Sequence, residues 1–164
     1  MRGDEAQLLV AAAFLHDIGY ASPALDSGFH PLDGARFLRG MGAAPRLCNL
    51  VANHSAAAAV AEILGLGDAL AEFPDEATCL RDALWYCDMA TSTTGSVTTF
   101  QERIADIRAR HGRDATVRAL DAGGLEARAA AFQRTERKLA RSVVMPTAPR
   151  ADCSGAADPV SPAR

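Results

Sequence analysis

The feature that constrains this chain most is an apolar helical run that ends in an adjacent histidine and aspartate. Apolar residues recur at helical spacing from Leu8 to Leu15, which predicts a buried helix. His16 and Asp17 follow directly, and Gly19 then favours the end of the helix. An imidazole and a carboxylate at a buried helix end are costly unless something pairs with both. A metal ion would satisfy both, because imidazole nitrogen and carboxylate oxygen suit Zn, Fe, Mn or Mg to different degrees.

The same pair also has a simple structural interpretation. His16 could be a core histidine bonded to a carbonyl, and Asp17 could be a surface residue at a helix end. For an isolated His-Asp dipeptide this interpretation is favoured, because so short a motif is weak evidence by itself. The other ligand-type residues of the chain are therefore needed to decide between the two.

Length and composition predict one helical domain. The chain has 164 residues, a net charge of −3 and 49% hydrophobic residues, which suits a single domain with a sizeable core. Alanine is abundant and aromatic residues are scarce, which favours helix, so the predicted fold class is all-α. We expect the helical domain to span residues 1–141 and a disordered Pro/Ala-rich tail to span residues 142–164.

Charge, hydropathy and the cysteines indicate which classes of partner and which cellular compartment to expect. The mild acidity gives no electrostatic footprint for a nucleic-acid polymer. No apolar run is long enough for a transmembrane helix, and residues 1–5 lack the pattern of a signal peptide. The cysteines form no C-x-x-C pair, which favours reduced core thiols in a cytoplasmic protein. They are Cys48, Cys79, Cys87 and Cys153.

Helical periodicity and capping residues predict the positions of the helices. Asp75 is an expected N-cap, and Thr99 with Glu102 matches a capping box. Residues 121–124 are expected to interrupt the helical pattern, and no strand is expected. The expected helices cover about residues 5–17, 31–41, 44–57, 58–66, 75–89, 99–111, 114–120 and 125–141.

Further ligand-type residues lie at the ends or on the apolar faces of these helices. His30 stands at the start of one helix, His54 shares a face with Leu47 and Val51, and Asp88 ends an apolar stripe. Inward-facing ligands from several helices often build metal sites in helical proteins. Each residue also has a structural alternative: a helix cap for His30, a core histidine for His54 and a helix-end acceptor for Asp88.

The order of these residues resembles the HD-domain superfamily of metal-dependent phosphohydrolases. The resemblance extends from about Leu8 to His111 and implies an all-α, HD/phosphodiesterase-like helical bundle. The similar stretches are His16-Asp17-Ile18-Gly19, Phe29-His30-Pro31-Leu32-Asp33-Gly34-Ala35, Asn53-His54-Ser55 and Ala83-Leu84-Trp85-Tyr86-Cys87-Asp88. The resemblance implies that Asp17 bridges if two metal ions bind. The metal ligands that it implies are His16, Asp17, His30, His54 and Asp88.

Two departures from the superfamily pattern stand out. The first histidine ligand of the superfamily lies on a helix before the His-Asp helix, whereas no histidine precedes His16 here. We therefore expect a domain that is shortened at its N-terminus, or that has lost one ligand. A missing helix would leave an apolar groove beside the first helix, which would lower the solubility of the chain or promote dimerisation. Tyr20 stands where many members carry a lysine that could bind phosphate as a point charge.

The function implied by the resemblance is hydrolysis of a phosphomonoester or nucleotide-like substrate through a metal-activated water. One or two divalent ions would bind, and the mixed ligands admit Fe, Mn, Zn, Co or Mg. Asp17 is the candidate to orient or deprotonate the water. Arg36 could meet a phosphate, and Ser55 or Asp33 could orient a ligand. The expected partner is therefore a small phosphorylated molecule.

Two alternatives to an active phosphohydrolase remain at this point. The chain could be a catalytically impaired or truncated module that keeps the fold, or, less favoured, a di-iron oxygenase with the ligand order of myo-inositol oxygenase. Among the other charged residues, His111 is expected to interact with the C-terminal end of its helix. Arg81, Arg103 and Arg108 are expected to be solvated.

Overall fold

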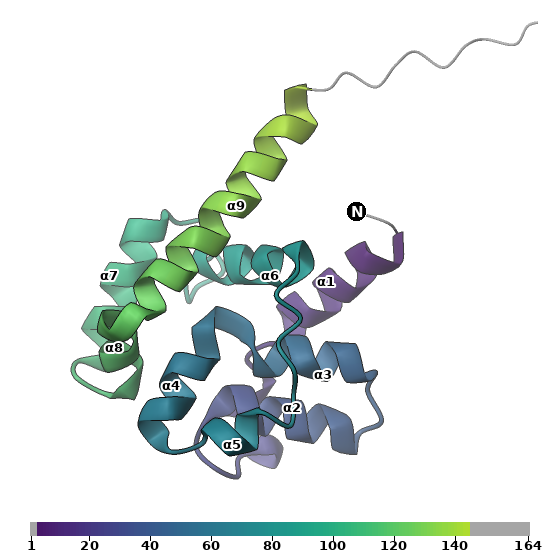
Figure 1. Ribbon diagram of the computed structural model, residues 1–164, viewed down its shortest axis with the longest axis vertical. Helices are drawn as coiled ribbons and strands as arrows, with labels where there is room; N and C mark the ends of the chain where they lie inside the picture. Colours follow the sequence, from purple (N-terminus) through teal and green to yellow (C-terminus); the bar gives the residue numbers. More distant parts are fainter. Residues whose placement is uncertain (1–2, 145–164) are drawn as a thin grey trace, which may run out of the picture.

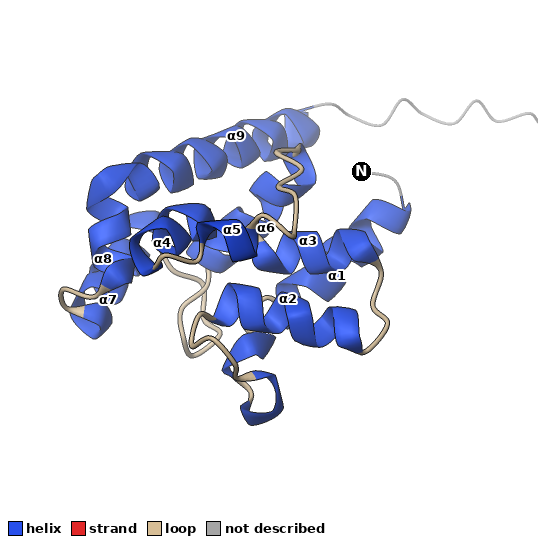
Figure 2. Cartoon of the chain, turned by 60° about the horizontal axis from the view of Figure 1, so that its bottom comes forward, coloured by secondary structure: helices blue, strands red, loops and turns tan. Residues whose placement is uncertain are grey.

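Helices make up most of the described part of the chain. The computed structural model describes residues 3–144, and Figure 2 shows them as helices joined by loops. Within this range, β pairing is limited to an isolated bridge between Thr91 and Val97. The predicted all-α fold class is therefore confirmed.

The helices follow one another with short connections, and their labels are those of Figure 1. The label η marks a 3-10 turn, except for η4, which is a π-helical turn. In chain order they are α1 (Gly3–Leu15), η1 (Ile18–Tyr20), η2 (Ser22–Ala24), α2 (His30–Gly40), α3 (Pro45–Ala52), η3 (His54–Ala56), α4 (Ala57–Leu64), α5 (Gly67–Leu70), α6 (Cys79–Met89), α7 (Phe100–His111), α8 (Ala115–Ala119), η4 (Leu120–Gly124) and α9 (Leu125–Val144).

Helix α6 joins the two halves of the chain. It packs against α1 and η3 from the first half and against α7 and α9 from the second. Figure 1 shows α9 crossing α6, with α1, α2 and α3 grouped on one side. Helix α2 packs on α3 and η1, and α4 packs on α8 and α5. The ends of α1, α3 and α6 are thereby brought close to the start of α2.

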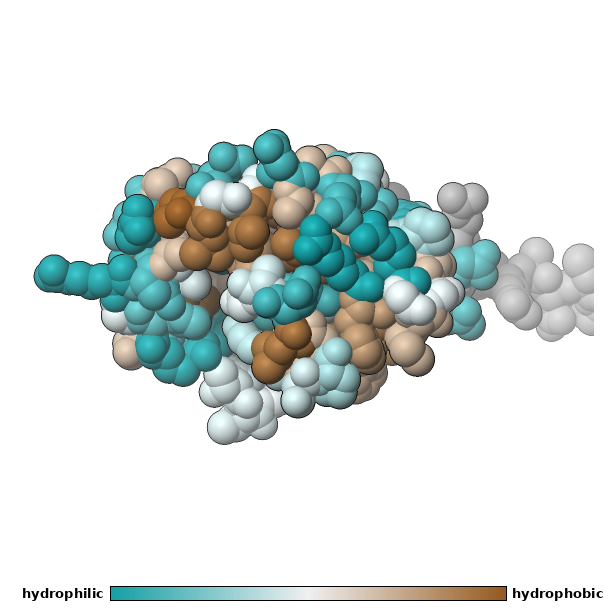
Figure 3. Space-filling model, turned by 90° about the horizontal axis from the view of Figure 1, so that it is seen from below, coloured by the Kyte–Doolittle hydropathy of each residue, from teal (hydrophilic) through white to brown (hydrophobic). Residues whose placement is uncertain are grey.

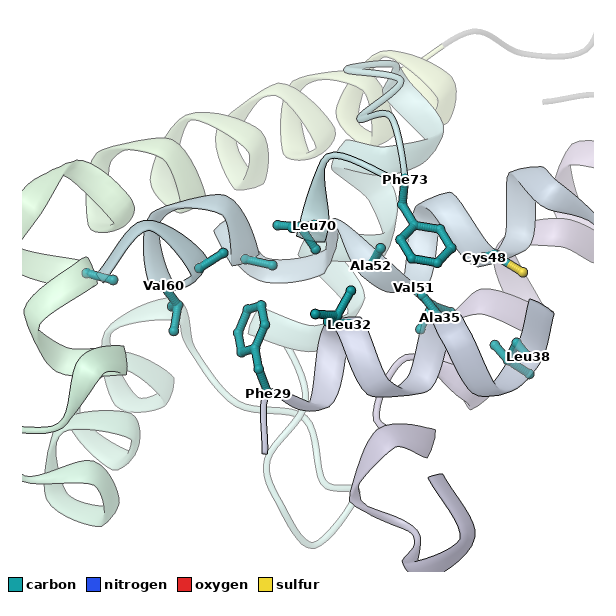
Figure 4. Close-up of a cluster of buried hydrophobic side chains, with 13 residues drawn as sticks. Phe29, Leu32, Ala35, Leu38, Cys48, Val51, Ala52, Val60, Leu70 and Phe73 are labelled. Carbon is teal, nitrogen blue, oxygen red and sulfur yellow. The ribbon is translucent and has the colours of Figure 1, made fainter. Parts of the chain in front are cut away.

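The largest buried cluster lies between α2 and the segment from α3 to α5. Figure 4 shows Phe29, just before α2, and Leu32 of α2 pointing toward the helices that carry Val60 and Leu70, with Phe73 beside them. Each of these five side chains is at most 7% exposed. Full burial of a side chain of this size contributes about 1.5–3 kcal/mol. This cluster fixes α2 relative to α3 and α4.

The prediction of one helix over residues 44–57 is wrong. Helix α3 ends before Asn53, and Ser55 and Ala56 adopt left-handed backbone conformations with φ of 47° and 56°. Such conformations cost about 1–3 kcal/mol each in residues other than glycine and persist only where the surroundings hold them. Trp85 contributes to this support, because its Nε1 donates to the backbone oxygen of Asn53 at 2.8 Å.

The predicted start of α6 is also wrong. Asp75 was expected to cap this helix, but the helix begins at Cys79, and Thr78 is its N-cap. The hydroxyl of Thr78 accepts from the backbone N–H groups of Leu80 and Arg81. Asp75 instead contacts Nε of Arg81 at 3.2 Å, so Arg81, expected to be solvated, is ion-paired and 11% exposed at its side chain.

Other boundaries agree more closely with the sequence patterns. The capping box of Thr99 and Glu102 is confirmed at the start of α7. The expected interruption at residues 121–124 is confirmed as the π-helical turn η4. Helix α9 continues to Val144, three residues beyond the predicted domain end. The rest of the predicted tail, residues 145–164, lies outside the described residues.

The cysteines differ from one another in exposure. Cys48 is buried and Cys87 is half-buried, and both are free thiols. Cys79, also a free thiol, is exposed, so the expected core position is wrong for this residue. Cys153 lies outside the described residues.

No single helix between residues 3 and 144 has the length and apolarity needed to cross a membrane. One bent pair, Pro45–Ala52 with His54–Leu64, would pass by length and composition alone. Val51, Ala52 and Ala61 of this pair are fully buried within the protein.

Helix α1 exposes large apolar side chains. Val10 is 55% exposed and Phe14 is 85% exposed. Figure 3 shows that apolar residues also gather in patches on the face seen from below, where hydrophilic residues interrupt them. The expected dimerisation beside α1 stays a prediction.

Candidate metal centre

Two glycines bring the first ligand-bearing segments together. A Cβ atom at Gly19 would lie 2.0 Å from the carbonyl oxygen of His30 and 2.8 Å from the backbone nitrogen of Gly34. In turn, a Cβ atom at Gly34 would lie 3.0 Å from the backbone nitrogen of Gly19. Turn η1 therefore packs backbone against backbone on the first turns of α2, and this contact places His16 and Asp17 beside His30.

His16 and His54 are each anchored to the end of the helix that precedes them. Nδ1 of His16 contacts the backbone oxygen of Ala13 at 2.8 Å, and Nδ1 of His54 contacts that of Val51 at 2.6 Å. A carbonyl oxygen can only accept, so Nδ1 carries the proton in both rings. In the neutral rings, Nε2 is then left with the lone pair that a metal ligand needs.

Three ligand-type atoms form a tight cluster. Oδ1 of Asp17, Nε2 of His30 and Nε2 of His54 all lie within 4.8 Å of one another. The Asp17 oxygen is 3.3 Å from the His30 nitrogen and 3.7 Å from the His54 nitrogen, and the two nitrogens are 3.1 Å apart. Ligand atoms that each lie about 2.0–2.2 Å from one ion are separated by such distances. These three residues therefore fit a single metal ion.

The second oxygen of Asp17 faces another group of ligand-type atoms. Nε2 of His16 lies 3.4 Å from Oδ2 of Asp17 and 3.9 Å from Oδ1 of Asp88. The structure thus brings the five residues that the resemblance implies as metal ligands to one place. Asp17 presents one oxygen to His30 and His54 and the other to His16.

Asp88 is held by two donors from other elements. Ser55 donates its hydroxyl to Oδ2 of Asp88, which is the kind of contact expected of a residue that orients a ligand. Arg103 contacts Oδ1 with Nη2 at 3.0 Å and the backbone oxygen with Nε at 3.3 Å. The prediction that Arg103 is solvated is wrong, since its side chain is 12% exposed. No pattern in the sequence connects this arginine to an aspartate fifteen residues earlier.

Asp33 and Arg36 contact other parts of the fold. Asp33 is buried and accepts hydrogen bonds from the backbone N–H groups of residues 26–28 and from the hydroxyl of Ser27. It therefore holds the loop that precedes α2. Arg36 contacts Glu72 at 2.5 Å, beyond α5. The roles expected for Asp33 toward a ligand and for Arg36 toward phosphate stay predictions.

The electrostatics of the centre favour the protonation states that metal ligands need. Burial alone would raise the pKa of Asp17, but the hydrogen bond with His30 and the nearby His16 and His54 lower it to about 2. Burial, reinforced by the His30 and His16 charges, lowers the pKa of His54 to about 4. Burial opposes ionisation of Asp88, yet His54, His16, Ser55 and Arg103 together lower its pKa. At neutral pH the carboxylates are ionised and His54 is neutral, as metal binding requires.

The free energy of unfolding of the metal-free protein should fall as the pH is lowered from about 6.5 to about 4. In this window His54 stays neutral in the folded protein, whereas the unfolded chain takes up the proton at the ordinary pKa of 6.5. The unfolded state then binds more protons, so stability rises with pH and falls with acidification. Asp17 adds a loss of the same sign between about 3.8 and about 2.

Urea unfolding at a series of pH values measures this dependence. The variant His54→Gln should show a flatter dependence between pH 6.5 and 4, because the shifted group has been removed. An identical slope in the variant and the natural sequence would show that another group is responsible.

The centre is open on one side and is separate from two cavities elsewhere. The side chain of Asp17 is 52% exposed, whereas that of His54 is 3% exposed, so solvent reaches the site from the Asp17 side. Two cavities of about 360 and 390 Å³ lie against α9, one beside Thr78 and Arg134 and the other beside Phe100. Neither cavity is lined by a candidate ligand.

The comparisons with known proteins concern this same part of the chain. Residues 2–84 match the family model of the HD domain. The matched span includes His16, Asp17, His30 and His54 and ends before Asp88. Comparisons with curated proteins and with solved structures gave no match.

Proposed function

The chain belongs to the HD-domain family, and on this basis we propose that it is a metal-dependent phosphohydrolase acting on a small phosphomonoester or nucleotide-like substrate. The observation that carries the proposal is the position of Asp17. Its two oxygens face two different sets of ligand-type atoms, one with His30 and His54 and the other with His16. This arrangement suits two adjacent divalent ions that share one carboxylate.

The ligand atoms divide into two sets. His30, His54 and Oδ1 of Asp17 would hold one ion, and His16, Asp88 and Oδ2 of Asp17 would hold the other. When bound, divalent ions lower the pKa of a coordinated water and polarise a phosphoryl oxygen. Mixed imidazole and carboxylate ligands admit Fe, Mn, Zn, Co or Mg.

Asp17 is the residue that we propose orients the attacking water. Its pKa of about 2 keeps it ionised, and an ionised carboxylate accepts hydrogen bonds through both oxygens. So low a pKa makes it a weak proton acceptor, which favours orientation of the water over deprotonation. Its exposed side chain lies where water and substrate can reach it.

Elemental analysis of the chain purified without chelator, followed by assays on phosphoesters, tests the proposal. We expect one or two equivalents of a transition metal per chain and hydrolysis of p-nitrophenyl phosphate. The double variant His54→Ala/Asp88→Ala should lose both the metal and the activity, since it removes one ligand from each set. His111→Ala is the control, because His111 contacts Asp114 outside the centre.

Three outcomes of this experiment would change the assignment. A chain that takes up no metal even after reconstitution would be an inactive module. Bound iron with oxygen-dependent turnover and without phosphatase activity would indicate an oxygenase. Metal retained by the double variant would show that the ions bind elsewhere.

A further inference from the structure

A row of charged residues on α7 begins at Asp88 of the candidate metal centre. Arg103, Asp106 and Arg110 follow one another at spacings of three and four and therefore share one face of the helix. Arg103 contacts Asp88 through Nη2 at 3.0 Å and Oδ2 of Asp106 through Nη1 at 3.1 Å. Arg110 contacts the same Asp106 oxygen through Nη2 at 2.9 Å. Two guanidinium groups thus converge on one oxygen beside a candidate ligand.

The outer end of this row is exposed, as is Tyr20 next to the centre. Tyr20 stacks on His30 with ring centroids 4.1 Å apart and is 58% exposed. Arg110 shares Oδ2 of Asp106 with Arg103, so the two guanidinium groups lie close together on this face of α7. The Arg110 side chain is 43% exposed and can therefore meet a ligand that enters from solvent.

A third guanidinium adds positive charge behind Asp88. Arg128 of α9 is 4% exposed, and its Nη1 contacts the backbone oxygen of Gly124 at 3.3 Å. Its Nε is buried and has no hydrogen-bond partner among the described residues. Burial lowers the pKa of Arg128 to about 10, and Asp88 favours its charge while Arg103 opposes it. Arg103 and Arg128 therefore both add positive charge beside Asp88.

We propose that Arg103 and Arg110 bind the phosphate group of the substrate. The inference rests on the proposed function and deepens it, because it assigns recognition of a phosphate dianion to α7. Bound divalent ions would attract such a group, and the guanidinium groups would add positive charge on the Asp88 side of the centre. A guanidinium carries N–H donors in a fork that matches phosphate oxygens. Asp106 engages Nε and Nη2 of Arg110, and other donors of this side chain remain for a ligand.

Arg108 provides a matched comparison on the same helix. Its side chain is 40% exposed, nearly as much as that of Arg110, and it is ion-paired with Asp121 at 2.7 Å. It lies off the face that carries Arg103 and Arg110. Replacing Arg108 therefore removes the same charge from α7 without touching the proposed phosphate contact.

Calorimetric titration of inorganic phosphate into the metal-loaded chain tests the inference. The variant Arg110→Gln should bind phosphate at least about tenfold more weakly, because it loses a charge-assisted hydrogen bond. It should keep its metal content and thermal unfolding midpoint, and Arg110→Lys should recover part of the affinity by restoring the charge. Arg108→Gln should bind phosphate like the natural sequence. In hydrolysis of p-nitrophenyl phosphate, Arg110→Gln should raise KM more than it lowers kcat.

The outcomes separate this inference from the proposed function. Equal phosphate affinity and equal KM in Arg110→Gln and the natural sequence would overturn the inference while leaving the hydrolase intact. The same loss of affinity in Arg108→Gln would overturn it too, since the effect would then be general charge. A natural chain that binds no phosphate would also overturn it. Selective loss in Arg110→Gln without hydrolysis by any metal form would support phosphate recognition and reject the hydrolase.

Discussion

Replacing Asp17 with asparagine should remove metal from both positions of the centre and lower phosphoester hydrolysis by at least about a thousandfold. Asparagine keeps the shape of the side chain but loses its negative charge and one of its two ligand oxygens. Because the two oxygens of Asp17 face separate sets of ligand atoms, this one change acts on both sets. Elemental analysis and kcat/KM for p-nitrophenyl phosphate measure the two effects.

Asp121→Asn is the matched control for this variant. Asp121 has a similarly exposed side chain, 59% against 52%, and pairs with Arg108 far along the chain from the ligands. Its replacement should leave metal content and hydrolysis unchanged. If Asp17→Asn keeps two equivalents of metal, Asp17 does not join the two positions.

The variant Gly19→Ala should lose at least about 3 kcal/mol of unfolding free energy. Its new methyl group would lie 2.0 Å from the carbonyl oxygen of His30, and a backbone atom cannot move aside by changing rotamer. Turn η1 must then separate from α2, which also pulls His16 and Asp17 away from His30. Urea unfolding and metal content should both show the loss.

Gly40→Ala tests whether any added methyl group has this effect. Gly40 lies at the end of α2, and a Cβ atom there would meet nothing within 4 Å. Alanine favours helix over glycine by about 1 kcal/mol, so this variant should be unchanged or slightly more stable. A Gly19→Ala protein as stable as the natural one would show that the contact between η1 and α2 can open at little cost.

The parts of the centre that could be predicted from the sequence are those with local or ordered patterns. His16 and Asp17 follow an apolar helical run, and His30, His54 and Asp88 stand at helix ends in an order that resembles a known superfamily. The capping box at the start of α7 could also be predicted, because Thr99 and Glu102 lie within one helical turn of each other. The all-α class followed from the same short-range periodicity.

The features that sequence reasoning missed depend on contacts between distant residues. The break before α4 has no glycine or proline, and Trp85 supports it from another helix. Arg103 looked like a solvated residue because Asp88 lies on the preceding helix. Thr78 rather than Asp75 caps α6, and Arg81 holds Asp75 outside the helix. Tertiary contacts decided each of these cases.

His16 and His54 are each anchored to the last turn of a helix, so the position of each candidate ligand depends on that turn staying folded. Each ring satisfies a carbonyl in the last turn of α1 or α3, so it stays in place only while that turn stays wound. Local opening of either terminus would swing a metal-binding nitrogen out of the centre, and a bound ion would in turn slow that opening. The rate of amide hydrogen exchange in the last turns of α1 and α3 should therefore report whether the centre holds an ion. Exchange should be slow when the ion is bound and fast when it is absent.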